Sequence, residues 1–175
     1  MRIALTTSLL ASLLIASLTH AASSSDTDTV NRLGQSKHTL VQGIREAAKT
    51  QGAPISAKFE FEDGKLWLSV YTAKAGIEPD AEHNTLIELK GEPIAATWNP
   101  GIEVFEDKKH LTRSAMQLTL LQQSKLDLAA LVEKTAAKEK GVPYSAIPAL
   151  KNGKAVVIVK FATPDGASHA VDVAL

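Results

Sequence analysis

Residues 47–70 read AAKTQGAPISAKFEFEDGKLWLSV, and residues 136–159 read AAKEKGVPYSAIPALKNGKAVVIV. The two stretches align without a gap and are identical at 10 of 24 positions, whereas unrelated segments would share roughly one or two. In each stretch a predicted helix ends at a glycine, and a strand begins near the following proline. An Asp-Gly or Asn-Gly pair then follows, which is the strongest short-range signal of a β-hairpin. The chain is therefore predicted to be α+β and to contain two related units.

The Asp63-Gly64 turn fixes the register of the first hairpin, because a two-residue loop leaves the strands no freedom to slip. Glu62 then faces Lys65. One face of the sheet should receive the helix of this unit and carries the apolar residues Phe59, Phe61, Leu66, Leu68 and Val70.

The Asn152-Gly153 turn fixes the second hairpin in the same way, so that Ala146 faces Val159. Pro148 lies in the first strand of this hairpin and has no N–H to donate. Its strand is therefore expected to be an edge strand or to carry a bulge.

The remaining patterns give the domain organisation. Each unit should be an N-terminal helix packed on an antiparallel sheet of three to four strands, with further strands at Thr85–Leu89, Ile94–Trp98 and Ala170–Leu175. Ser124 and Asp127 resemble a capping box for the second helix. The predicted parts are a signal peptide at 1–21, a flexible leader at 22–37, a first unit at 38–105, a connecting helix at 106–124 and a second unit at 125–175.

The N-terminal stretch resembles a secretory signal peptide. Arg2 precedes an apolar run from Ile3 to Leu18, and the small residue Ala21 is the expected cleavage point. An uncleaved membrane anchor is the alternative, but the run is shorter than the roughly 20 apolar residues that span a bilayer. The mature protein is thus expected to be periplasmic or secreted, without stable membrane insertion. With no cysteine it can hold neither a lipoprotein anchor nor a disulfide.

Charge argues against two classes of partner. The sequence has 19 basic and 19 acidic residues, and neither sign collects on one segment. Nucleic acid and anionic membrane surfaces are therefore poor candidates.

No catalytic constellation stands out. The histidines after the signal segment are His38, His83, His110 and His169, and none has a second ligand-type residue at metal-site spacing. The sequence also lacks a Gly-x-Ser-x-Gly motif and any thiol. We therefore predict no catalytic, cofactor-binding or metal-binding residues and no enzymatic activity. The alternative, a small hydrolase, requires His83, His110 or His169 to meet a carboxylate in a pocket.

The far side of each predicted sheet is unusually apolar. In the derived register it carries Trp67 and Tyr71 in the first unit and Ile147, Val156 and Ile158 in the second. Either the units cover these residues by packing together or joining into one sheet, or the residues bind a partner. Trp67, Tyr71 and Trp98 are the candidate binding residues, because aromatic side chains commonly anchor protein interfaces.

The order of helix, Gly-x-Pro break, Ser-Ala step, strand, Asp-Gly or Asn-Gly turn and long strand resembles the PepSY domain family in both halves. The resemblance covers about residues 39–98 and 126–175. The chain departs from the family after the third strand, where it has Leu89-Lys90-Gly91-Glu92-Pro93 in place of an acidic residue and a Thr-Gly step.

The resemblance implies an extracytoplasmic, non-enzymatic domain that restrains proteases. The expected function is binding of a protein or peptide, with an extracytoplasmic protease as the specific candidate and no cofactor. A structural role in envelope assembly is the further alternative.

Overall fold

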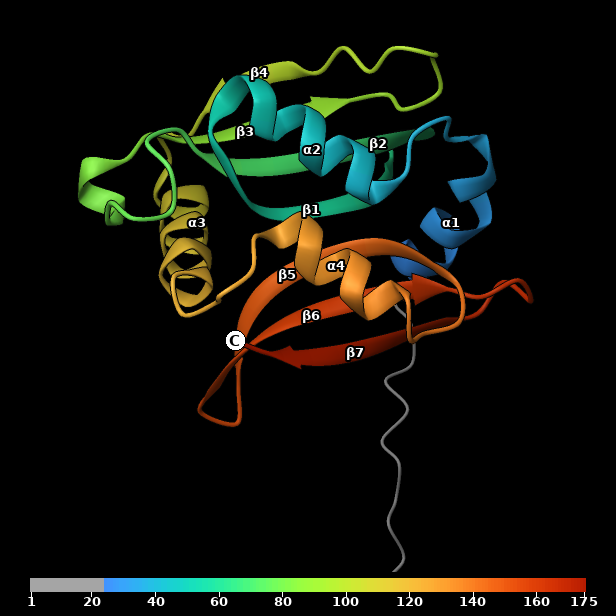
Figure 1. The fold of residues 1–175 in the computed structure, drawn as a ribbon. Coiled ribbons are helices and arrows are strands. Elements are labelled where there is room, and N and C mark those ends of the chain that lie inside the picture. Colours follow the sequence, from blue (N-terminus) through green and yellow to red (C-terminus); the bar gives the residue numbers. More distant parts are fainter. Residues whose placement is uncertain (1–23) are drawn as a thin grey trace, which may run out of the picture.

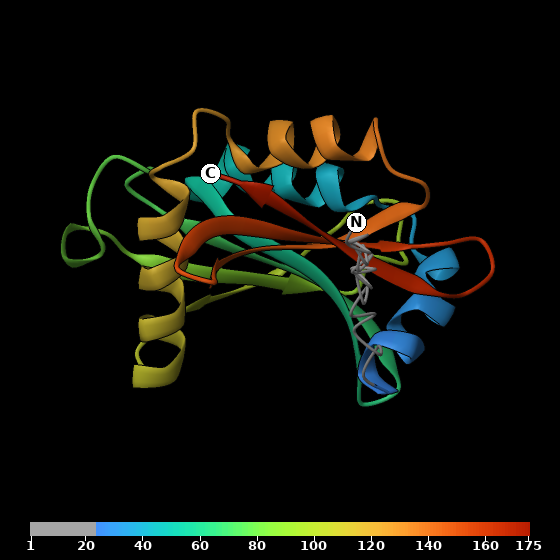
Figure 2. The ribbon, with the colours of Figure 1, turned by 90° about the horizontal axis from the view of Figure 1, so that it is seen from below.

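The computed structural model describes residues 24–175. These residues form an α+β fold in which helices lie on both sides of a strongly twisted sheet (Figures 1 and 2). The elements, in chain order, are α1 (Ser24–Arg32), η1 (Leu33–Gln35), α2 (Leu40–Gln51), β1 (Ala53–Glu62), β2 (Lys65–Ala73), η2 (Ala81–His83), β3 (Leu86–Gly91), β4 (Gly101–Val104), α3 (Lys108–Leu121), α4 (Leu128–Ala136), β5 (Val142–Lys151), β6 (Lys154–Ala162) and β7 (Ser168–Ala174).

All seven strands belong to one antiparallel sheet with the order β4-β3-β2-β1-β5-β6-β7. The two halves of the chain meet where β1 pairs with β5, with Ala57 opposite Ala146 and Lys58 opposite Ser145. Ala57 and Ala146 are also matching positions of the two similar stretches. The strands of the first half lie on one side of this antiparallel pair and those of the second half lie on the other, so the two halves form a continuous sheet.

Both predicted hairpin registers are confirmed. Glu62 pairs with Lys65 in the first hairpin, and Ala146 pairs with Val159 in the second. Asp63 and Asn152 have φ angles of 50° and 51°, the left-handed conformation that a two-residue hairpin turn requires. β5 is a central strand and its register shift lies between Pro143 and Ser145, away from Pro148, which pairs regularly with Val157. On its other side β5 pairs with β1 only at Ser145 and Ala146, so Pro148 lies beyond that pairing.

Helices α2 and α4 lie side by side on one face of the sheet (Figure 1). The predicted helix face is correct: a Cβ added to Gly43 of α2 would lie 2.5 Å from the side chain of Leu68, so α2 packs closely on this face. Arg45 of α2 and Glu133 of α4 join the helices through an ion pair of 2.9 Å. The core lies between these helices and the sheet and includes Leu40, Ile44, Leu68, Val132 and Val159.

The opposite side of the sheet, called the second face below, carries Lys58, Glu60, Trp67, Ser69 and Tyr71. Figure 2 shows α3 and α1 on this side, near opposite ends of the strands. Gln117 of α3 accepts a hydrogen bond of 2.8 Å from the buried hydroxyl of Ser56. The predicted connecting helix therefore also covers part of the second face.

The expectation of a flexible leader at 22–37 is wrong where the structure describes it, because α1 and η1 occupy most of this segment. The helix is held by tertiary contacts: the Thr29 hydroxyl accepts a hydrogen bond of 3.0 Å from the Phe61 backbone N–H. Asp26 pairs with Lys160 at 2.7 Å. The predicted signal peptide at 1–21 lies outside the described residues.

Two local predictions are also corrected. Residues 94–98 form no strand, and the fourth strand of the first half is β4, which pairs with β3. The capping box at Ser124 is absent, since Asp127 alone caps α4 by accepting a hydrogen bond of 2.7 Å from the Ala130 N–H. Ser124 instead bonds to the backbone of Leu126.

Candidate functional site

Trp67, Tyr71 and Trp98 do not share one surface. Trp98 is only 5% exposed, and its ring nitrogen lies 2.8 Å from where a Cβ on Gly91 would stand. Gly91 pairs with Leu68, so Trp98 packs at the end of the sheet on the side of α2. Its role in this structure is to fill space over Gly91.

Tyr71 lies on the second face but is only 6% exposed. Phe105 packs against its ring edge-on at 4.9 Å, and Arg113 of α3 reaches its hydroxyl. Burial, reinforced by the charge of Glu88, raises the pKa of Tyr71 to about 12. Phe105 and α3 thus cover the residue that the sequence left unexplained on the far side of the first hairpin.

Trp67 is the candidate with accessible surface, since its side chain is only partly buried. Two ammonium groups lie over its ring, Lys65 at 5.6 Å and Lys90 at 5.5 Å from the ring centre. A cation over an indole face is favourable. The partly accessible indole therefore lies against two positive charges.

Glu60 lies beside Trp67 and organises a polar cluster on the second face. Its carboxylate contacts the ammonium of Lys58, lies 3.3 Å from that of Lys90 and accepts a hydrogen bond of 3.1 Å from Ser69. Burial acts to raise the pKa of Glu60, but these partners outweigh it and the pKa is lowered. Glu60 is therefore a fixed negative charge at neutral pH.

Glu88 is a second carboxylate in this cluster and behaves in the opposite way. It is 8% exposed, and burial raises its pKa even though Ser69 and Lys90 favour the charged form. Two carboxylates with opposite pKa shifts on either side of one hydroxyl are a feature of some acid–base sites. Sequence reasoning missed Glu88 because its strand reads as an ordinary alternating segment.

The histidines named as a condition for hydrolase activity do meet carboxylates, each in a separate place. His83 Nδ1 lies 2.7 Å from Asp80, His110 Nδ1 lies 2.5 Å from Asp107, and His169 Nε2 lies 3.5 Å from Glu139. Asp80 and Asp107 are helix N-caps. Hydrogen bonds from the His83 imidazole and then its backbone N–H lower the pKa of Asp80, and hydrogen bonds from the His110 backbone N–H and then its imidazole lower the pKa of Asp107. Two of these pairs are thus explained by helix capping.

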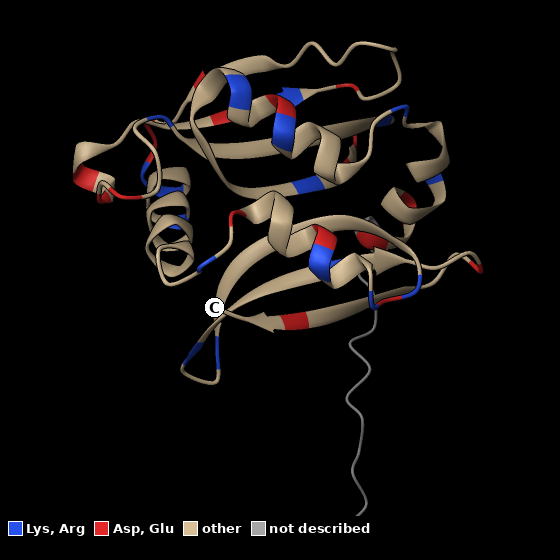
Figure 3. Ribbon diagram, in the orientation of Figure 1, with Lys and Arg blue, Asp and Glu red and all other residues tan. Residues whose placement is uncertain are grey.

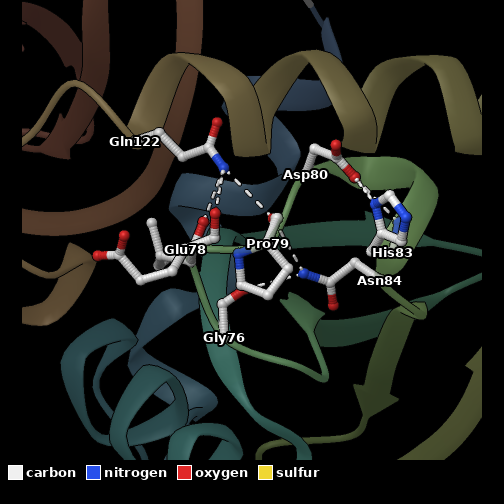
Figure 4. A network of polar contacts seen from close by, with 8 residues as sticks. Gly76, Glu78, Pro79, Asp80, His83, Asn84 and Gln122 are labelled. Atoms are coloured by element: carbon white, nitrogen blue, oxygen red, sulfur yellow. Dashed lines mark hydrogen bonds and ion pairs between the residues drawn. The ribbon is translucent and has the colours of Figure 1, made fainter.

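His83 and Asp80 belong to a network that fixes the loop between β2 and β3 (Figure 4). The side-chain amide of Gln122, at the end of α3, donates to the Ile77 carbonyl at 2.8 Å. Asn84 donates to the Gly76 carbonyl at 2.9 Å. The network joins the loop to α3 and gives the loop a structural explanation.

A groove of about 770 Å³ lies between α4 and β7. Its lining includes apolar side chains from both elements and from the chain end, together with three lysines. The sequence did not point to this groove, although the alternation of Val171, Val173 and Leu175 marks one apolar side of the last strand.

Charges elsewhere are interspersed along the ribbon (Figure 3). Among residues 24–175, no group of three or more His, Asp or Glu side chains is arranged to hold a metal ion. No helix in this part of the chain is long and apolar enough to cross a membrane.

Comparisons with protein-family models, with curated proteins and with solved structures give no match. The resemblance to the PepSY family therefore stays a prediction from the sequence pattern.

Proposed function

We propose that this protein is an extracytoplasmic, non-catalytic protein that binds another protein or a peptide through the second face around Trp67. The narrower form of the proposal is that the partner is a protease whose activity is restrained by binding. Extracytoplasmic location rests on the signal-peptide pattern, and the protease on the PepSY resemblance. The observation that carries the binding site is the partly buried indole of Trp67 among charged side chains.

The composition of the site supports a protein partner. Tryptophan is enriched among the residues that dominate binding energy, and Glu60, Lys65 and Lys90 surround this one with groups that can form hydrogen bonds. Glu60 and Lys90 contact each other and Lys65 pairs with Glu92, so these side chains are already ordered and binding would cost little further side-chain entropy. A helix or a loop of a partner protein is the kind of element that binds such a surface.

We further infer that the two halves are related units. Gly52 and Gly141 both have positive φ, and a Cβ on either would lie 2.4 Å from a carbonyl oxygen, that of Ala73 or Ala162. These two contacts occupy matching places, since the offset between the stretches is the same for both pairs. The PepSY-like plan of a helix on a hairpin accounts for this correspondence.

The test is a pull-down from secreted and periplasmic extract with the purified protein as bait, comparing wild type with Trp67→Ala. Removing an aromatic anchor should cost at least about 2 kcal/mol of binding, or roughly thirtyfold in affinity. Leu150→Ala is the matched control because Leu150 is an exposed apolar residue, 63% accessible, in the other half. Any retained protease is then assayed with and without the protein.

Three results would contradict the proposal. The first is specific capture that Trp67→Ala leaves unchanged, which would move the site elsewhere. The second is unfolding of Trp67→Ala, which would make the ring part of the core. The third is retention of no specific protein.

The hydrolase alternative gains one specific observation, the opposite pKa shifts of Glu60 and Glu88 around Ser69. An acid–base pair of this kind would lose turnover by a factor of about 10² or more in either Glu60→Gln or Glu88→Gln. A panel of ester, glycoside and peptide substrates tests it.

A further inference from the structure

The two edges of the sheet differ in how well they are protected. β4 forms one edge and is only four residues long, with Asn99-Pro100 directly before it. β7 forms the other edge over seven residues that contain neither proline nor glycine, and its pairing with β6 runs without a register shift. Natural edges are usually shortened, bulged or charged to prevent strand addition, and β7 has little of this protection.

The hydrogen bonds of β7 show which of its backbone groups face outward. Leu175 N–H donates to the Ala155 carbonyl at 3.2 Å, and Thr163 N–H donates to the Ala167 carbonyl at 2.9 Å. Bonding in an antiparallel pair alternates along the strand, so every second residue from 169 to 175 turns toward β6. The backbone N–H and C=O groups of Ser168, Ala170, Asp172 and Ala174 therefore face away from the sheet.

The groove lies directly beside this edge. Its apolar part is formed by Leu126, Leu131, Val171, Val173 and Leu175. Val171, Val173 and Leu175 are only partly buried, so their apolar surface is incompletely covered within the described chain. A strand added next to β7 would place alternate side chains on this surface.

The charges around the groove are unbalanced in favour of the positive sign. Lys125, Lys134 and Lys138 line it, and none of them forms an ion pair within residues 24–175. The acidic residues nearby are engaged, Asp172 with Lys151 and Glu139 with His169. The groove is thus complementary to negative charge.

The first half of the molecule shows what this position accepts. In that half, β3 is the third strand from the junction of the halves, and β4 pairs with its outer side. Glu88 of β3 lies opposite Glu103 of β4. β7 is likewise the third strand from the junction, and no described residue pairs with its outer side.

We propose that β7 and the neighbouring groove bind an extended acidic peptide, which adds to the sheet as a further antiparallel or parallel strand. The backbone of the peptide bonds to Ala170 and Asp172, its alternate apolar side chains contact Val171 and Val173, and its carboxylates face Lys134 and Lys138. This surface is separate from Trp67, so the inference goes beyond the proposed function.

The test uses a fluorescent synthetic peptide with alternating valine and threonine at its centre and glutamate at both ends. Its binding to the purified protein is measured by anisotropy. Ala170→Pro removes one outward N–H and leaves the bonds to β6 in place, and it should weaken binding at least about tenfold. Ile102→Pro is the matched control, because Phe105 N–H donates to Leu86 and Ile102 therefore faces outward from the opposite edge.

Two further measurements isolate the backbone and the charge. A peptide N-methylated at alternate amides should lose binding to the wild-type protein, which guards against a folding defect in Ala170→Pro. Lys134→Glu with Lys138→Glu should weaken binding about tenfold or more, with less effect at high salt. Trp67→Ala should bind the peptide normally, which separates this inference from the proposed function.

The proposal is overturned if the peptide binds Ala170→Pro as tightly as wild type, if a version with lysine ends binds equally well, or if no binding occurs up to about 1 mM peptide. It is also overturned if wild type forms a dimer that Ala170→Pro prevents, since the edge would then serve a second copy of the chain.

Discussion

The two halves of the sheet agree on the side of α2 and α4 and differ on the second face. On the helix side, Ala57 and Ala146, Leu68 and Val157, and Val70 and Val159 occupy matching positions, and all six are buried. On the second face, the first half has Lys58, Glu60, Trp67 and Ser69 where the second half has Ile147, Ala149, Val156 and Ile158. One framework therefore supports either a polar, aromatic surface or an apolar one.

The difference separates what the fold requires from what it permits. A hairpin with a helix on one side needs the buried residues, since both halves have them. It does not need the Glu60 cluster, since the second half forms the same hairpin without it. The cluster is thus a better candidate for function than any residue that the two halves share.

The largest expected effect separates Trp98 from Trp67, which the sequence grouped together. Trp98→Ala should destabilise the protein by about 3–5 kcal/mol because it leaves a large cavity over Gly91. Trp67→Ala should cost about 1 kcal/mol, less than Trp98→Ala, because the Trp67 side chain is only partly buried. Urea denaturation followed by circular dichroism measures both. Equal losses would remove the distinction between a core residue and a surface anchor.

The next prediction tests whether the halves are equivalent at their helix ends. Gly52→Ala and Gly141→Ala should each cost about 2–4 kcal/mol, because the added Cβ meets a backbone carbonyl and the φ angle is positive. Gly76→Ala is a control for the φ angle alone, since nothing lies within 4 Å of its added Cβ. A large loss at Gly52 with none at Gly141 would argue against equivalent units.

Local features of the fold could be predicted from the sequence, because they depend on neighbouring residues. The Asp63-Gly64 and Asn152-Gly153 turns fixed both hairpin registers, and alternation identified the face that receives α2. The pairing of Ala57 with Ala146 could not be predicted from the sequence, because it depends on which edge strand of one hairpin pairs with which edge strand of the other. Helix α1 was missed for a similar reason: its polar sequence has no apolar stripe, and its stability comes from contacts such as Thr29 with Phe61.

The candidate site was predictable only in part. Alternation placed Trp67 and Tyr71 on the second face, but it could not reveal that Phe105 and α3 cover Tyr71. Trp98 was chosen for its residue type, and its burial depends on the course of the loop before β4. The groove beside β7 requires the tertiary placement of α4, which no local pattern gives.

A smaller effect concerns Glu60, which has no charged counterpart in the second half. Glu60→Gln should cost about 1–2 kcal/mol near neutral pH because Lys58 and Lys90 lose their shared partner. The folded-state pKa of Glu60 is lowered from its ordinary value of 4.5, so its stabilisation is present above that value and lost as pH falls through the folded pKa.

Urea melts of wild type and Glu60→Gln across this acidic range should therefore converge as pH decreases. Glu103→Gln is a suitable control, since Glu103 is exposed and forms no ion pair within the described residues. A difference between the proteins that stays constant with pH would show that the charge of Glu60 is not the cause.

The smallest effect should come from Glu88 and should have the opposite sign. Burial raises the pKa of Glu88, so folding is favoured when this group is protonated, and stability is lost as pH rises from the ordinary carboxyl value through the raised one. Glu88→Gln keeps an amide near Ser69 without the charge. It should raise the free energy of unfolding by up to about 1 kcal/mol near pH 7 and leave it unchanged near pH 4. Because Glu60→Gln destabilises and Glu88→Gln stabilises at the same neutral pH, the two variants together test whether one polar cluster shifts the pKa values of its two carboxyls in opposite directions. Destabilisation by both would mean that Glu88 is charged and paired like Glu60.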